Sequence, residues 1–63
     1  GQRVLLVDDL IATGGTAAAS CHLLEDLGAA IVECAFVVEL PDLGGRARLG
    51  NRPMISLVRF EGE

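Results

Sequence analysis

The chain carries four consecutive aliphatic residues, Val4-Leu5-Leu6-Val7, near its start, with no polar residue between them. A short continuous apolar run that ends at polar residues predicts a β-strand buried on both faces. Such burial is typical of a central strand in a parallel sheet. Two acids, Asp8 and Asp9, follow the run at once. We expect both to lie just past the end of this strand.

The spacing of apolar residues changes between Thr16 and Leu27. Plotted at the period of about 3.6 residues of an α-helix, the apolar positions gather on one side of the cylinder. These positions are Ala17, Cys21, Leu23, Leu24 and Leu27. The lone histidine, His22, falls on the opposite, polar side, where a solvated side chain is expected. The segment is predicted to be an amphipathic helix that ends at Gly28, a residue common after the last helical turn.

The remaining segments read as strands joined by a loop. In residues 29–40 one strand face is wholly apolar, whereas the other carries Glu33 and Glu39 and is expected to be an edge or interface face. Residues 41–53 form a loop with a short helical turn around 46–49, and residues 54–60 a third strand. Strand, helix and strand within about 35 residues form one βαβ unit. The fold class is therefore α/β, with parallel strands, a right-handed crossover and a helix on one sheet face only.

Composition narrows the classes of partner. The 63 residues include five arginines, no lysine and nine acids, which give a formal net charge of −4. A basic face for nucleic acid or an anionic membrane is therefore not expected. No signal peptide precedes the acids, so a cytoplasmic protein is predicted. Cys21 and Cys34 fit no metal-binding spacing and are expected to be buried free thiols.

The turn between the first strand and the helix carries the candidate chemistry. Glycines 14 and 15 allow backbone conformations in which successive N–H groups converge on one anion. The same N–H groups lie at a helix N-terminus, where phosphate binding is favoured. The acids at 8 and 9 would accept hydrogen bonds from a sugar diol or hold Mg²⁺. The alternative is structural: the acids end a strand, and Thr13 or Thr16 caps the helix. Neither a P-loop lysine nor the G-x-G-x-x-G spacing is present.

The stretch VLLVDDLIATGGT resembles the phosphoribosyl-pyrophosphate (PRPP) motif of the type I phosphoribosyltransferase family. Together with ECAFVVELPDLGGRARL, it is most similar to the adenine-specific branch. The resemblance implies a Rossmann-like βαβ portion of that family's parallel sheet, with residues 1–63 as the C-terminal part of a single domain. It implies that the 5′-phosphate of PRPP or AMP is bound by Ala12, Thr13, Gly14, Gly15 and Thr16. It further implies that Asp8 and Asp9 bind the ribose.

The family transfers phosphoribose from PRPP to a base and releases pyrophosphate. The resemblance therefore implies purine salvage, with PRPP, adenine and AMP as ligands, Mg²⁺ bound through PRPP and a homodimeric full-length protein. In that family the catalytic loop and most of the base pocket lie upstream, so no catalytic residue is expected in this chain and the isolated 63 residues are expected to be inactive. Alternatives are a non-catalytic PRPP- or nucleotide-sensing regulator, or transfer to another base. Ala12, which cannot transfer a proton, favours adenine.

Three arginines, Arg46, Arg48 and Arg52, cluster in the loop before the third strand. They could contact an anion or a neighbouring subunit, but solvated loop charges are expected.

Overall fold

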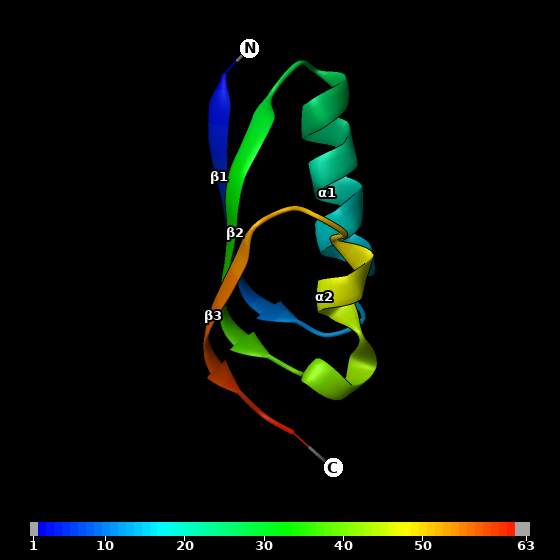
Figure 1. Cartoon of the computed structure of the whole chain (residues 1–63), viewed down its shortest axis with the longest axis vertical. Coiled ribbons are helices and arrows are strands. Elements are labelled where there is room, and N and C mark those ends of the chain that lie inside the picture. Colours follow the sequence, from blue (N-terminus) through cyan, green and yellow to red (C-terminus); the bar gives the residue numbers. More distant parts are fainter. Residues whose placement is uncertain (1, 62–63) are drawn as a thin grey trace.

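A computed structural model describes residues 2–61 and shows a three-stranded parallel sheet with its helices on one side (Figure 1). In chain order the elements are β1 (Arg3–Ile11), α1 (Gly15–Asp26), β2 (Ala30–Glu39), the 3-10 turn η1 (Pro41–Leu43), α2 (Gly45–Arg48) and β3 (Met54–Arg59). The sheet order is β1-β2-β3. The predicted α/β class, the parallel strands and the short helix after β2 are therefore confirmed.

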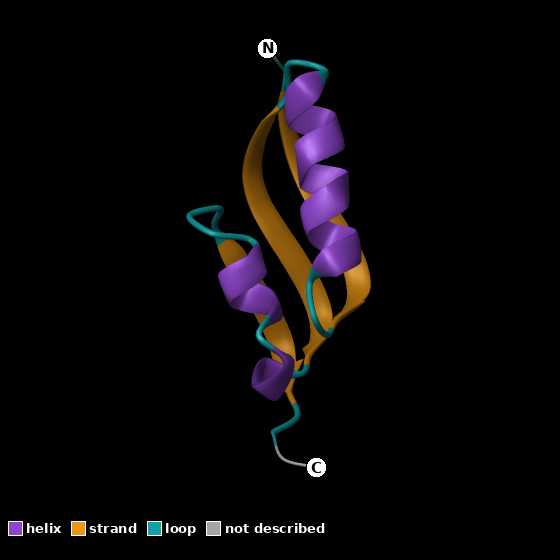
Figure 2. Cartoon of the chain, turned by 90° about the vertical axis from the view of Figure 1, so that its right-hand side faces the viewer, coloured by secondary structure: helices purple, strands orange, loops and turns teal. Residues whose placement is uncertain are grey.

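Both helices pack on the same face of the sheet (Figure 2). The core between them consists of Ile11, Ala17, Ala18, Cys21, Cys34, Phe36 and Leu49. The opposite face carries apolar side chains that no element of residues 2–61 covers, including Val37 and Leu57. The prediction that a helix covers only one face is confirmed.

The first strand departs from its predicted environment. β1 lies at an edge of the sheet rather than at its centre, and Leu5 and Val7 are 55% and 65% exposed. The prediction of burial on both faces is wrong for the described residues. A continuous apolar run shows that both faces of a strand carry apolar side chains. Whether they are buried depends on other elements that pack on those faces.

The helix faces the sheet with its smallest side chains. Ala17, Ala18 and Cys21 are buried, whereas Leu23 and Leu27 are 62% and 76% exposed. The prediction that these two leucines face the core is wrong. Small residues let the helix approach the strands closely, which turns the longer side chains away from the sheet.

Cys21 and Cys34 are free and completely buried between α1 and β2, with their Sγ atoms 3.8 Å apart. The predicted buried thiols are confirmed. Burial, with a contribution from the neighbouring Cys21 thiol, raises the pKa of Cys34 to about 11. The thiol is therefore protonated, and poorly nucleophilic, at neutral pH.

Glu39, at the end of β2, is 2% exposed and accepts hydrogen bonds from two other elements. Arg46 Nη2 on α2 lies 2.9 Å from Glu39 Oε1, and Ser56 Oγ on β3 donates to the same oxygen at 2.8 Å. Arg59 adds a longer ion pair at 3.6 Å. The expected edge or interface role of Glu39 is thus wrong: its carboxylate ties α2 to the sheet. The Arg46 hydrogen bond lowers the pKa of Glu39, against the opposing effect of burial.

The expectation that the loop arginines are merely solvated is also wrong for two of the three. Arg46 pairs with Glu39, and Arg52 forms a bidentate pair with Glu25 on α1 at 2.7 and 2.9 Å. The loop thereby joins the first helix to the segment before β3.

Candidate anion site at the end of the first strand

The two acids lie inside β1, not past its end as predicted. The strand continues through Asp8 and Asp9 to Ile11, and Asp8 is aligned with Phe36 of β2. The Asp9 amide donates a hydrogen bond to Asp8 Oδ1 at 2.7 Å, which orients the Asp8 carboxylate. Both residues are exposed. Sheet pairing therefore fixes their backbone while their carboxylates remain accessible to solvent.

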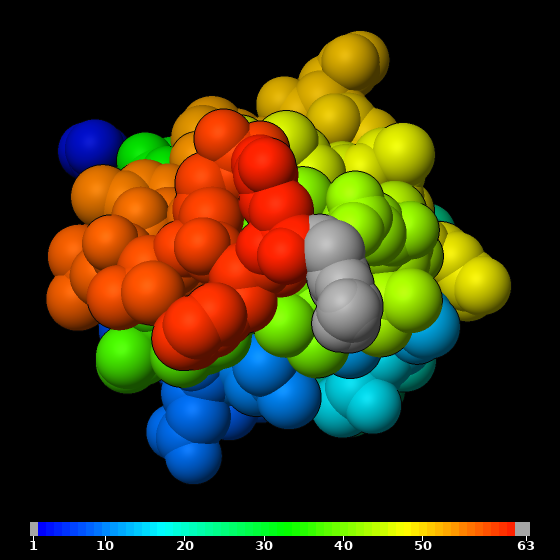
Figure 3. All heavy atoms as spheres, turned by 90° about the horizontal axis from the view of Figure 1, so that it is seen from below, coloured from blue at the N-terminus to red at the C-terminus, as the bar shows by residue number. Residues whose placement is uncertain are grey.

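Three residues, 12–14, connect β1 to α1 and end in a left-handed backbone conformation. Gly14 has φ of +85°, where a side chain costs roughly 1–2 kcal/mol. Space is also lacking: a Cβ on Gly14 would lie 2.7 Å from the Gly45 carbonyl oxygen and 2.8 Å from Arg48 Cβ. The loop is thus pressed against α2, and the two segments lie side by side when the molecule is seen from the carboxyl ends of the strands (Figure 3).

The contact between the loop and α2 also leaves no space for a side chain at the first residue of α2. A Cβ on Gly45 would lie 2.5 Å from the Ala12 carbonyl oxygen and 2.6 Å from Ile11 Cγ1. Two glycines, one in each segment, therefore allow the backbones of the loop and of α2 to meet. Glu39 holds α2 against the sheet through Arg46, and α2 in turn packs against the loop.

The N-terminus of α1 has no side-chain cap. Gly14 is the N-cap residue, and no side chain caps the helix there. The Thr13 hydroxyl accepts only a long hydrogen bond of 3.4 Å from the Gly15 amide. The capping role considered for Thr13 or Thr16 is therefore not supported. First-turn N–H groups have no intrahelical partner, and no acidic residue occupies this turn. The arrangement leaves oriented donors, together with the positive end of the helix dipole, open to an anion.

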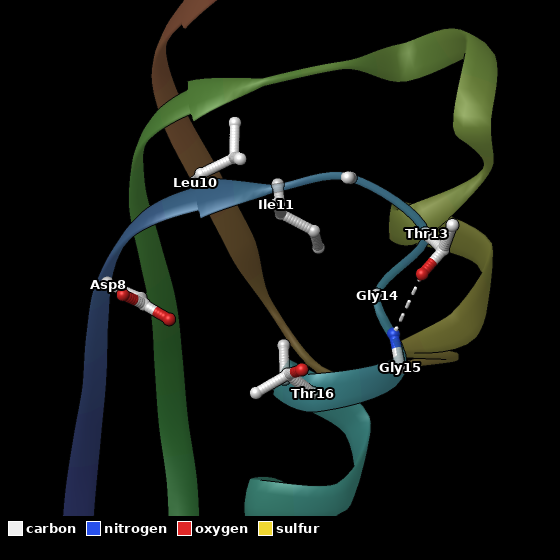
Figure 4. A pocket seen from close by; sticks show the side chains of 9 residues that line it. Asp8, Leu10, Ile11, Thr13, Gly14, Gly15 and Thr16 are labelled. Atoms are coloured by element: carbon white, nitrogen blue, oxygen red, sulfur yellow. Dashed lines mark hydrogen bonds between the residues drawn. The ribbon is translucent and has the colours of Figure 1, made fainter.

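These groups surround a hollow of about 180 Å³ (Figure 4). It is lined by Asp8, Leu10, Ile11, Ala12, Thr13, Gly14, Gly15, Thr16 and Ala17. The Asp8 carboxylate reaches toward it from the strand, and Thr16 faces it from the first turn of the helix (Figure 4). A carboxylate thus lies at one side of the hollow and oriented N–H groups at the other. This polarity suits a ligand with hydroxyls at one end and a phosphate at the other.

The structure brings together all five predicted phosphate-loop residues and Asp8, but Asp9 does not line the hollow. Within residues 2–61 no three His, Cys, Asp or Glu side chains are grouped so as to hold a metal ion. In the same range, no helix is long and apolar enough to cross a membrane. His22 is exposed on α1 and does not line the hollow, in agreement with its predicted solvated position.

Sequence reasoning missed the supporting role of α2. The signal available was the second glycine pair, Gly44-Gly45, immediately before the arginine cluster. A glycine pair at a helix start permits another backbone to approach closely, but the sequence alone does not identify that partner segment.

Comparison with known proteins supplies independent findings. The phosphoribosyl transferase domain family matches residues 1–53. An adenine phosphoribosyltransferase from Desulfosudis oleivorans is 57% identical over 63 residues, which are all of this chain and 36% of that protein. A crystal structure of adenine phosphoribosyltransferase from Thermoanaerobacter pseudethanolicus superposes with a TM-score of 0.93 at 50% identity, over 95% of this chain and 35% of the other.

A more distant relative is the adenine phosphoribosyl transferase of Trypanosoma brucei, solved in complex with AMP, pyrophosphate and ribose-5-phosphate. It is 38% identical, with a TM-score of 0.83 over 90% of this chain and 27% of the other. The chain thus spans about a third of the length of these relatives.

Proposed function

Since the chain belongs to the phosphoribosyl transferase domain family, we propose that the protein containing it converts adenine and PRPP to AMP and pyrophosphate in purine salvage. One observation carries the proposal: the uncapped N-terminus of α1 and the Asp8 carboxylate face one hollow from opposite sides. In this reaction an adenine nitrogen loses its proton and forms a bond to the anomeric carbon of the ribose, while the bond from that carbon to pyrophosphate breaks.

We propose that the first-turn N–H groups and the Thr13 and Thr16 hydroxyls bind the 5′-phosphate. The small residues Ala12, Gly14 and Gly15 keep the loop close to it. Asp8 would accept hydrogen bonds from the ribose hydroxyls, and Asp9, beside the hollow, would act through water or Mg²⁺. As positive charge develops on the ribose in the transition state, a nearby carboxylate would stabilise it.

Mg²⁺ would enter with PRPP rather than occupy a protein site. Mg²⁺ is commonly held by one or two carboxylates together with substrate phosphates and waters, and Asp8 and Asp9 could supply no more than that. When bound, the ion would neutralise part of the pyrophosphate charge.

Adenine is proposed as the base on two grounds. The relatives described above are named for adenine, and one was solved with AMP. Ala12 also places no proton-transferring side chain beside the hollow. The rival proposals are a nucleotide-sensing regulator and transfer to another base. A cytoplasmic location and a homodimer stay predictions.

The deciding experiment offers adenine, hypoxanthine and orotate, each with PRPP and Mg²⁺, to the protein at its natural length. We expect nucleotide only with adenine. Product from hypoxanthine or orotate but not from adenine would contradict the base assignment. Binding of PRPP with no product from any base would favour the regulator. The 63-residue chain alone is expected to give no AMP, because it spans only about a third of the length of its relatives.

Exchange of both acids for amides separates ligand binding from folding. In the protein with Asp8→Asn and Asp9→Asn we expect PRPP affinity to fall by about 100-fold, since two charge-assisted acceptors are lost. The melting temperature should stay close to that of the wild type, because both side chains are exposed. Calorimetry with PRPP tests this, with Asp26→Asn, an exposed acid at the far end of α1, as the matched control. Unchanged PRPP affinity would rule out the ribose role.

A further inference from the structure

The Arg48 guanidinium, on α2, lies near Gly15, a residue that lines the hollow, although Arg48 itself does not line it. Its Nη1 lies 3.8 Å from the position that a Cβ of Gly15 would occupy, and Thr13 Oγ1 lies at the same 3.8 Å. The guanidinium and the loop hydroxyl therefore flank the same point of the first helical turn. Sequence reasoning grouped Arg48 with solvated loop charges and did not connect it with the loop that begins thirty-six residues earlier, at Ala12.

Arg48 is also the uncommitted member of the arginine cluster. Arg46 pairs with Glu39, and Arg52 pairs with Glu25. Among residues 2–61, the Arg48 side chain has neither an ion pair nor a hydrogen bond. Its charge therefore remains available to a ligand, at no cost of breaking an existing pair.

The base of this side chain is held firmly although its tip is free. Arg48 Cβ lies 2.8 Å from the Cβ position of Gly14, so the backbone of α2 touches the loop at this point. Gly45, the first residue of α2, closely approaches Ala12, and Arg46 fixes α2 to Glu39. These contacts fix the backbone from which the Arg48 side chain extends.

The charges around the loop explain why a positive side chain at position 48 would favour phosphate binding. The loop contains no lysine, and the nearest charged residues along the sequence are Asp8 and Asp9, whose carboxylates repel a phosphate dianion. Main-chain N–H groups provide partial charges only. A guanidinium adds a full charge and several N–H donors in a geometry that matches phosphate oxygens.

We propose that Arg48 is a further ligand-binding residue, which closes over the rim and pairs with the phosphate group held at the N-terminus of α1. The inference rests on the proposed function, because that function places a sugar phosphate in the hollow. Arg48 supplies from α2 the positive charge that the loop itself lacks.

The test measures ribose 5-phosphate binding by calorimetry, in the protein at its natural length, at about 0.1 M and about 1 M salt. Arg48→Gln removes the charge but keeps a long polar side chain, and we expect its affinity at low salt to fall about fivefold to tenfold. At high salt the difference should shrink to about twofold, since screening weakens an exposed pair. Arg48→Lys keeps the charge but loses the planar donor geometry, so its affinity at low salt should fall by clearly less than that of Arg48→Gln.

Arg3→Gln is the matched control, because Arg3 is an exposed arginine at the opposite end of β1. It should bind like the wild type. Equal affinity of Arg48→Gln and Arg3→Gln would overturn the inference while leaving the proposed function intact. An equal loss in Arg48→Lys and Arg48→Gln would overturn the role of the charge. Failure of the wild type to bind ribose 5-phosphate would overturn the proposed function and this inference together.

Discussion

Replacement of Gly14 by alanine is expected to reduce the affinity for ribose 5-phosphate by at least about 100-fold. The new methyl group would meet the Gly45 carbonyl oxygen at 2.7 Å and Gly45 Cα at 2.8 Å, both of which are backbone atoms that cannot rotate away. The loop must then shift, and the N–H groups of the first helical turn would no longer converge on the phosphate. Calorimetry with ribose 5-phosphate, together with thermal unfolding, measures both consequences.

Gly28→Ala is the matched control for this substitution. Gly28 has φ of +93°, close to that of Gly14, but an added Cβ would meet nothing within 4 Å. The control therefore carries the same left-handed backbone cost, roughly 1–2 kcal/mol, without the collision. It should lose stability but bind ribose 5-phosphate as the wild type does. If Gly14→Ala kept wild-type affinity, the loop would not be the phosphate site.

Glu39→Gln is expected to lower the free energy of unfolding by about 2 kcal/mol at pH 7, because one partner of a buried charge pair is lost. The estimate stays below the value for fully buried pairs, since the Arg46 and Arg59 side chains are 51% and 54% exposed and can be solvated. Thermal unfolding of the protein at its natural length, followed from pH 7 to pH 3, provides the measurement.

The pH dependence has a definite sign. The pKa of Glu39 is lowered in the folded state, chiefly by the Arg46 hydrogen bond, so its stabilisation is fully present above the unfolded-state pKa. It is lost as the pH falls through the lower, folded-state pKa. The stability difference between wild type and Glu39→Gln should therefore be largest near pH 7 and shrink toward pH 3.

The control for this measurement is Glu25→Gln, which removes an acid whose side chain is 36% exposed, compared with 3% for Glu39. Its effect on unfolding should be clearly smaller. An equal or larger effect at position 25 would contradict the structural role given to Glu39.

The strands, the helix and the loop could be predicted from the sequence because each is set by neighbours along the chain. The alternating apolar residues of β2 and the 3.6-residue spacing in α1 report local geometry directly. The glycines at 14 and 15 likewise mark a turn whatever surrounds it. The predicted phosphate-loop residues therefore came together where the pattern placed them.

What failed depends on partners distant in the sequence. Apolar character alone could not show that β1 would lie at an edge, because the cover for a strand comes from other elements. Glu39 alternates like a surface residue, yet Arg46 and Ser56, which lie in α2 and β3, allow its burial. Arg48 could not be assigned to the loop, since only the folded chain brings α2 against Gly14.

The mutual contact of Gly14 and Gly45 limits how far the phosphate loop can be treated as a portable motif. A graft of residues 7–16 into another strand–helix turn would transfer the N–H donors of the loop. It would not transfer α2, whose contact with Gly14 sets the loop conformation. Conversely, a change in length between residues 41 and 45 would reposition the loop without altering one of its residues. A transfer of this site to another protein must therefore include both the loop and the α2 segment.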